Sequence, residues 1–178
     1  DRYQITTTRK VPDAVLDEIK QQGFMGLLIP KQYGGKEFST LAISSIMAKV
    51  NPYCPTAGTF VVIPNSLGAA ELLKHYGTEE QKNAYLPKLA SGEYVPCFGL
   101  TELTAGSDAA SIKAEGVVFR DDHGEIKIRL NFRKRYITLA PAANLISLAF
   151  QMHDPDNLLG KGEYPGITVI MLHKGTPG

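Results

Sequence analysis

The residues best suited to bind a ligand lie between Cys97 and Asp108, where a short apolar strand leads into a turn rich in hydroxyl groups and glycine. Gly106 can adopt a positive φ there without steric cost. Backbone N–H groups and the hydroxyls of Thr101, Thr104 and Ser107 could converge on one anionic or carbonyl-bearing ligand. On local composition alone, a capped strand end that binds nothing is the simpler interpretation.

Other kinds of chemical site find no support in the sequence. There is no phosphate-binding P-loop, no GxGxxG fingerprint and no GxSxG nucleophile elbow. The two cysteines, Cys54 and Cys97, form no metal-ligand spacing. The four histidines are scattered along the chain, at His75, His123, His153 and His173. We therefore expect no metal site.

Composition bounds the class of protein. The 178 residues suffice for one large domain or two small ones. The net charge is +1, from 19 basic and 18 acidic residues, so no nucleic-acid partner is expected. No apolar run approaches the roughly 20 residues that span a bilayer. Two cysteines without a disulfide framework favour a reducing cytoplasm. A start without Met and an end at Thr-Pro-Gly suggest that both ends have been cut from a longer chain.

Up to Gly92 the pattern is helical. We expect residues 1–10 to be extended. The expected helices cover Val11–Lys20, Ser39 or Thr40 to about Lys49, Pro64–Tyr76 and Gln81–Pro87. Thr78 and Gln81 have the spacing of a capping box, and Pro87 is expected to end the last helix.

From Tyr94 onward the pattern changes to short strands separated by turns. They are expected at residues 95–100, Val117–Arg120, Glu125–Phe132, Tyr136–Leu139, Leu145–Phe150 and Gly166–Leu172. The sequence thus predicts an α-helical domain over residues 1–92 and an antiparallel β domain over residues 93–178.

Several motifs, taken together, resemble the acyl-CoA dehydrogenase family. Phe98–Asp108 follows the family pattern aromatic-x-x-T-E-P-x-A-G-S-D, with Leu103 in place of proline. Lys134–Leu139 is similar to K-x-W-I-T-N, with tyrosine for tryptophan. In the helical half, Gly26–Gly35 looks like G-x-x-x-P-x-x-Y-G-G. The run from Tyr76 to Glu93 looks like GTEEQK…LPxLASGE. The sequence most resembles the large bacterial members of this family that act in fatty-acid β-oxidation.

The resemblance implies an α+β multidomain fold: an N-terminal all-α domain, an antiparallel β-barrel-like middle domain, and a C-terminal helical domain that is missing here. The implied reaction is α,β-dehydrogenation of a fatty acyl-CoA to the trans-2-enoyl-CoA, with FAD as the hydride acceptor. The alternatives are a flavin monooxygenase or acyl-CoA oxidase of the same fold, or a non-catalytic acyl-CoA-binding relative.

The resemblance also assigns roles to residues. Leu100 and Thr101 would bond the pyrimidine edge of the flavin, and Thr138 would donate to its N5. Ser107 would contact the pyrophosphate region and lie near the acyl-pantetheine channel. The implied flavin-binding set is Phe98, Leu100, Thr101, Gly106, Ser107, Tyr136, Ile137 and Thr138. No catalytic residue is expected in the chain, because the family's base belongs to the C-terminal domain; Glu102 is not chosen for that role.

The implied partners are an acyl-CoA substrate and an electron-transfer flavoprotein or similar acceptor. The full-length protein would be a homo-oligomer. The expected location is the cytoplasm, or the periphery of the inner membrane. Without the C-terminal domain, the fragment should be inactive and bind flavin weakly.

Overall fold

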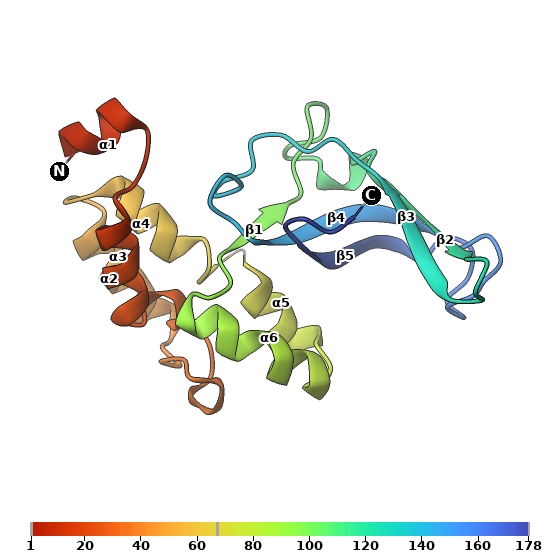
Figure 1. Cartoon of the computed structure of the whole chain (residues 1–178), viewed down its shortest axis with the longest axis horizontal. Helices are drawn as coiled ribbons and strands as arrows, with labels where there is room; N and C mark the ends of the chain where they lie inside the picture. The colour runs from red at the N-terminus through yellow and green to blue at the C-terminus, as the bar shows by residue number, and fades with distance from the viewer. Residues whose placement is uncertain (1, 67, 178) are drawn as a thin grey trace. The chain divides into compact units, whose positions relative to one another are not determined.

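The computed structural model describes residues 2–66 and 68–177. The chain divides into two compact units (Figure 1). The helical unit comprises Asp1–Cys97 together with Leu139–Leu145, and the sheet unit comprises Phe98–Thr138 together with Ile146–Gly178. Each unit is therefore assembled from two separate stretches of sequence.

The helical unit contains six α-helices and two short 3-10 turns in its described part. They are α1 (Arg2–Thr8), α2 (Asp13–Gln21), η1 (Phe24–Gly26), η2 (Lys31–Tyr33), α3 (Thr40–Val50), α4 (Pro55–Val62), α5 (Ala69–Tyr76) and α6 (Glu79–Ser91). Residues 2–8 are thus helical rather than extended as predicted; residue 1 lies outside the described residues.

The predicted helix starts follow from local chemistry. The Ser39 hydroxyl accepts a hydrogen bond from Ala42 N and caps α3. The predicted capping box is confirmed: Thr78 Oγ1 accepts from Gln81 N at 3.2 Å, and Thr78 N donates to Gln81 Oε1 at 3.0 Å. In each bond a side-chain oxygen accepts from a backbone N–H group that has no partner within the helix.

Two expected helix boundaries are wrong. The helix α6 does not stop at Pro87 but continues to Ser91. Proline removes one helical hydrogen bond, yet Leu89 and Ala90, which follow it, are both buried, and this burial favours continuing the helix. The helix α5 begins at Ala69, with Gly68 as its N-cap, instead of at Pro64; residue 67 is outside the described residues.

Asn65 is the polar centre of the helical unit. Its Oδ1 accepts from Leu28 N at 3.1 Å, and its Nδ2 donates to Phe24 O at 2.7 Å and Val61 O at 2.8 Å. The side chain is buried. It joins α4 to the apolar segment 24–30, whose Met25 and Ile29 lie in the core.

The sheet unit is built on five strands in its described part. They are β1 (Pro96–Gly99), β2 (Glu115–Arg120), β3 (Ile126–Asn131), β4 (Leu145–His153) and β5 (Gly166–His173), with the 3-10 turn η3 (Ala109–Ser111) before β2. The strand order is β1-β4-β2-β3, and β5 also pairs with β4 (Figure 1).

The sheet is mixed and open rather than an antiparallel barrel as expected. β2 and β3 pair antiparallel, with Val118 opposite Ile128. β2 and β4, however, pair in parallel, with Glu115 opposite Gln151. A parallel pair needs a long crossover instead of a tight hairpin, and residues 121–144 supply it. Alternating polarity identifies a strand but not the direction of its neighbour, which explains the error.

One close approach holds β2 against β4. Gly116 faces Phe150, and a Cβ at position 116 would lie 2.4 Å from that aromatic ring. Phe150 is fully buried in a cluster with Ala114, Val118 and Met152. A glycine is therefore required here for space, so that the largest side chain of this core can lie against the β2 backbone.

The Asn65→Ala variant should lower the unfolding free energy by about 2–4 kcal/mol, because the buried groups Leu28 N, Phe24 O and Val61 O lose their partner. Urea unfolding followed by helical circular dichroism measures this loss. Asn83→Ala, on the exposed face of α6, is the matched control and should leave stability nearly unchanged. Equal stability of the two variants would contradict the role of Asn65.

Candidate functional site

The Thr101–Ser107 segment begins with a tight turn that follows β1. Glu102 N donates to Ala105 O at 3.0 Å, and Ala105 N donates to Glu102 O at 3.4 Å, so Leu103 and Thr104 form the tip. Ala105 packs with Ile112 and Ala149 in a small buried cluster, against which Leu100 also lies. Packing therefore fixes the base of the turn while its tip stays exposed.

Lys134 joins this turn to the second predicted site segment. Its Nζ donates to Leu100 O at 3.0 Å and to Glu102 Oε1 at 2.7 Å. The next residue, Arg135, donates its backbone N–H to Thr101 O at 3.0 Å. The structure thus brings Leu100 and Thr101 together with Lys134 and Arg135, although more than 30 residues separate them in the sequence.

Glu102 forms a buried ion pair with Lys134: the two side chains are only 7% and 6% exposed. Its Oε2 accepts from Lys113 N at 2.7 Å, and its Oε1 accepts from Ala114 N at 2.9 Å. Burial raises the pKa of Glu102, but the hydrogen bonds from Lys134 and the two backbone N–H groups outweigh it and hold the pKa below the ordinary 4.5. The carboxylate is therefore charged, paired and unsuited to abstract a proton.

The groups left available at this site are hydrogen-bond donors. Leu100 has both backbone groups engaged, since its N–H donates to Phe98 O and its carbonyl accepts from Lys134. The carbonyl of Thr101 is engaged by Arg135. Within the described residues, the Thr101 N–H and the hydroxyls of Thr101 and Thr138 have no partner. Leu100 can therefore contribute packing more readily than a backbone donor.

The segment 136–139 is a turn, and the prediction of a strand there is wrong. Tyr136 and Leu139 have positive φ values of 59° and 66°. Left-handed backbone is costly for residues other than glycine or asparagine. The side chain of Tyr136 is 74% exposed, with the Arg135 guanidinium 5.5 Å from its ring centroid. Strain of this kind is typical of segments that position a ligand.

The other predicted site residues are not joined to Lys134 by hydrogen bonds in the part of the chain that the structure describes. Phe98 and Ile137 are half-buried, whereas Gly106 and Ser107 are exposed. Within the described residues no hydrogen bond ties Gly106 or Ser107 to Lys134. Gly106 does not adopt the positive φ that the sequence allowed, and a Cβ there would meet nothing within 4 Å. Glycine is therefore not sterically required at this position.

A pocket of about 290 Å³ adjoins the ion pair within the sheet unit. Its walls are Glu102, Leu103, Thr104, Lys113, Ala114, Asn131, Phe132 and Arg133. The lining combines polar and charged side chains with the exposed apolar side chains of Phe132 and Leu103. Sequence reasoning did not single it out, because it gathers residues from the turn, from η3 to β2, and from the end of β3.

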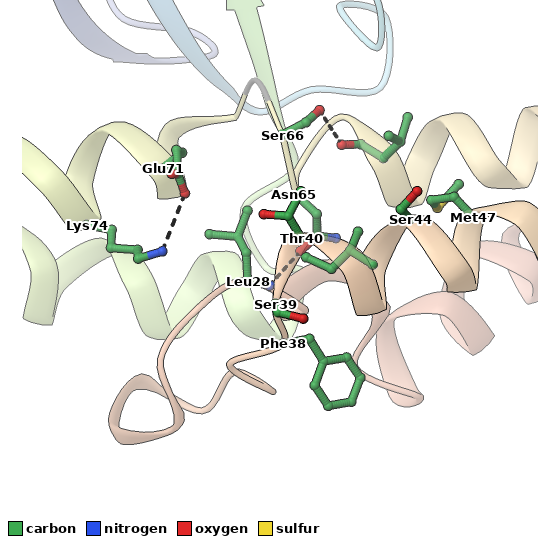
Figure 2. A pocket seen from close by; sticks show the side chains of 12 residues that line it. Leu28, Phe38, Ser39, Thr40, Ser44, Met47, Asn65, Ser66, Glu71 and Lys74 are labelled. Atoms are coloured by element: carbon green, nitrogen blue, oxygen red, sulfur yellow. Dashed lines mark hydrogen bonds and ion pairs between the residues drawn. The ribbon is translucent and has the colours of Figure 1, made fainter.

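A larger pocket of about 520 Å³ lies in the helical unit (Figure 2). Apolar side chains of Leu28, Ile43 and Met47 face it, with the hydroxyls of Thr40 and Ser44 beside them. The spacing of these α3 residues at three and four positions is the signal that could have predicted this face. At the rim, Glu71 is engaged by Lys74 at 3.8 Å and by His75 at 2.9 Å. The pocket suits an apolar group rather than acid–base chemistry.

Two features are absent from residues 2–66 and 68–177. No cluster of three or more histidine, cysteine, aspartate or glutamate side chains is arranged to hold a metal ion. No helix in this part is long and apolar enough to cross a membrane.

Glu102→Gln should destabilise the protein by about 3–5 kcal/mol at pH 7, because it leaves the Lys134 ammonium buried without its counter-charge. The folded pKa of Glu102 is lowered, so the stabilisation from its charge is complete above the ordinary 4.5 and is lost as the pH falls below it. The difference between wild type and variant should therefore shrink below pH 4.5.

Urea unfolding at pH 7, 5, 4 and 3 measures this trend. Glu125→Gln removes an exposed carboxylate that is paired with Lys127 and serves as the control; it should change stability little at any pH. A constant difference between wild type and Glu102→Gln across the series would show that the ion pair does not titrate as described.

Comparison with known proteins identifies the family. The model of the acyl-CoA dehydrogenase N-terminal domain matches residues 2–93, and that of the acyl-CoA dehydrogenase middle domain matches residues 97–178. An acyl-CoA dehydrogenase of Bacillus subtilis is 32% identical over 171 residues, which cover 96% of this chain and 42% of that protein.

Two further proteins show the range of relatives. A 3-(aryl)acrylate reductase of Clostridium sporogenes is 35% identical over 175 residues, covering 98% of this chain and 43% of that protein. The solved structure of a glutaryl-CoA dehydrogenase from Mycobacterium smegmatis in complex with FADH2 superposes with a TM-score of 0.76 at 26% identity, covering 94% of this chain and 39% of that one.

The chain spans about two fifths of the length of these relatives. Both family models match in the order in which the helical and sheet units begin along the sequence. The chain therefore belongs to the acyl-CoA dehydrogenase family, whose cofactor is FAD.

Proposed function

We propose that this chain is the N-terminal and middle part of a flavin-dependent acyl-CoA dehydrogenase, which forms a trans-2-enoyl-CoA from a fatty acyl-CoA. The observation that carries the proposal is the pairing of Thr101 with the Lys134–Thr138 segment, since it brings both motifs of the resemblance into one site. When bound, FAD would supply the acceptor for a hydride from the β carbon. The proposed domains are residues 1–92 and 93–178.

The available donors fit a flavin. On the oxidised ring N1, O2, O4 and N5 accept hydrogen bonds and N3–H donates one, and the site offers the Thr101 N–H and the hydroxyls of Thr101 and Thr138. The exposed ring of Tyr136 and the half-buried Phe98 and Ile137 would provide apolar contact. Donors aimed at atoms that gain negative charge on reduction stabilise the reduced state.

Two further assignments concern the exposed loop and the catalytic base. Ser107, with Gly106, would contact the pyrophosphate and lie near the acyl-pantetheine chain; its hydroxyl is exposed and has no partner within the described residues. Glu102 would not be the base, because its carboxylate forms an ion pair with Lys134 and accepts hydrogen bonds from two backbone N–H groups. We infer that the base lies in a C-terminal helical domain outside this chain.

The proposal extends to partners and location. An electron-transfer flavoprotein or similar acceptor would reoxidise the flavin, and the full-length protein would form a homo-oligomer. Its place would be fatty-acid β-oxidation, in the cytoplasm or at the periphery of the inner membrane. These statements rest on membership of the family and on the sequences of the motifs. Oxidase, monooxygenase and non-catalytic acyl-CoA-binding relatives of the same fold remain the alternatives.

A second candidate is the reverse reaction, reduction of an α,β-unsaturated acyl substrate. It is favoured by the 35% identity to the 3-(aryl)acrylate reductase of Clostridium sporogenes, which covers 98% of this chain. The same donors serve both directions, because a site that stabilises reduced flavin also holds it while it delivers hydride. The direction then depends on the substrate and the electron partner.

The complete gene product, loaded with FAD and kept anaerobic, should lose its visible flavin absorbance on addition of an acyl-CoA. Palmitoyl-CoA and butyryl-CoA, added separately, compare long and short chains. Bleaching by either supports the dehydrogenase. Bleaching by none, together with reoxidation of chemically reduced flavin by an enoyl-CoA or an aryl acrylate, would favour the reductase instead. Binding of acyl-CoA with neither change would indicate the non-catalytic relative.

The 178-residue chain by itself should not oxidise acyl-CoA in the presence of an artificial electron acceptor, because Glu102, the carboxylate next to Thr101, is ionised and paired with Lys134. Dye reduction with the purified chain and added FAD measures this. Turnover above the level of free FAD would show that the base lies within these residues and that the assignment to another domain is wrong.

A further inference from the structure

Among the described residues, no hydrogen bond or ion pair joins the Lys134 side chain to Thr101 or Thr138, yet Lys134 links the segments that carry both. Its ammonium donates to Leu100 O and to Glu102, the residues before and after Thr101. We propose that Lys134 is a positioning residue, whose ammonium sets the spacing between the flavin donors of Thr101 and Thr138. This inference rests on the proposed function and deepens it.

The Glu102 carboxylate, which is itself held in place, sets the position of the Lys134 ammonium. Glu102 accepts hydrogen bonds from Lys113 N and Ala114 N, and Ala114 is buried in the core of the sheet unit. The carboxylate is therefore held from the β2 side independently of Lys134. The lysine binds to this fixed carboxylate and to the Leu100 carbonyl, so the backbone at 134–135 has one favoured distance from the turn.

Apart from the bond from Arg135 N to Thr101 O, little else in the turn enforces that distance. Leu103, at the tip, is 57% exposed and, unlike a proline, does not lock its backbone φ. Tyr136 follows in left-handed backbone, a conformation that persists only where surrounding contacts hold it. The contacts on its N-terminal side are those of Lys134 and the Arg135 N–H. Loss of the ammonium should thus release the strained turn and move Thr138.

A buried ion pair is weak evidence for a purely stabilising role, because apolar replacements of both partners are often as stable. Such a pair can instead specify one arrangement of the segments that it joins. The two roles predict different outcomes when both charges are removed together. If the pair only stabilises the fold, the variant without both charges should regain the stability and the flavin binding of wild type. If Lys134 positions the segments, that variant should regain stability while its flavin donors remain misplaced.

The test uses the complete gene product with FAD and four variants: Lys134→Met, Glu102→Gln with Lys134→Met, Lys134→Arg, and Lys127→Met. The measurements are the FAD dissociation constant, the absorbance envelope and midpoint potential of the bound flavin, and the melting temperature. Lys127→Met, on β3 and paired with Asp121 and Glu125, is the exposed control and should bind FAD as wild type does.

Lys134→Met should weaken FAD binding at least about tenfold, the equivalent of one lost hydrogen bond, and shift the flavin spectrum. The double variant should regain much of the melting temperature but neither the affinity nor the spectrum. Lys134→Arg, which keeps the charge, should lie between wild type and Lys134→Met. These results support the positioning role.

Two results would overturn the inference, and they are distinguishable. If wild type binds FAD and the double variant matches it in affinity, spectrum and potential, Lys134 is structural only and the proposed function stands. If wild type takes up no FAD, the proposed function itself fails, and the positioning role fails with it.

Discussion

The ion pair between Lys134 and Glu102 is the interaction on which the site depends. Both side chains are buried and both charged groups are hydrogen-bonded, and the pair connects the turn after β1, the residues just before β2 and the segment after β3. None of these segments is adjacent in sequence. The charges contribute no chemistry of their own, since Glu102 stays ionised and paired. We propose that their effect is to position the unpaired donors of other residues, namely the Thr101 N–H and the hydroxyls of Thr101 and Thr138.

Local chemistry predicted much of the helical unit from the sequence. The capping box at Thr78 and Gln81 and the Ser39 cap are defined by side chains within four residues of the bond they make, so a single sequence suffices. The extension of α6 past Pro87 was missed because burial of Leu89 and Ala90, a tertiary effect, offsets a local penalty. The parallel partner of β2 was missed because the alternation of polar and apolar residues does not encode the direction of the neighbouring strand.

The candidate site was predictable in its residue types but not in its geometry. The hydroxyls at Thr101 and Thr138 follow from the motifs, whereas the engagement of the Leu100 carbonyl depends on a lysine 34 positions away. The turn at Tyr136–Leu139 was read as a strand because its side chains have strand-like composition. Its left-handed residues are imposed by neighbouring contacts, which no local propensity encodes.

The interleaving of the two units along the chain has a consequence for how they can fold. Residues 139–145 belong to the helical unit, where Asn144 donates to Glu93 O, accepts from Val95 N and completes the end of that unit. A peptide ending near residue 97 would lack these bonds, and one beginning there would carry seven residues of the other unit. The helical unit is thus incomplete without residues 139–145, and synthesis must pass residue 145 before that unit can form all of its contacts.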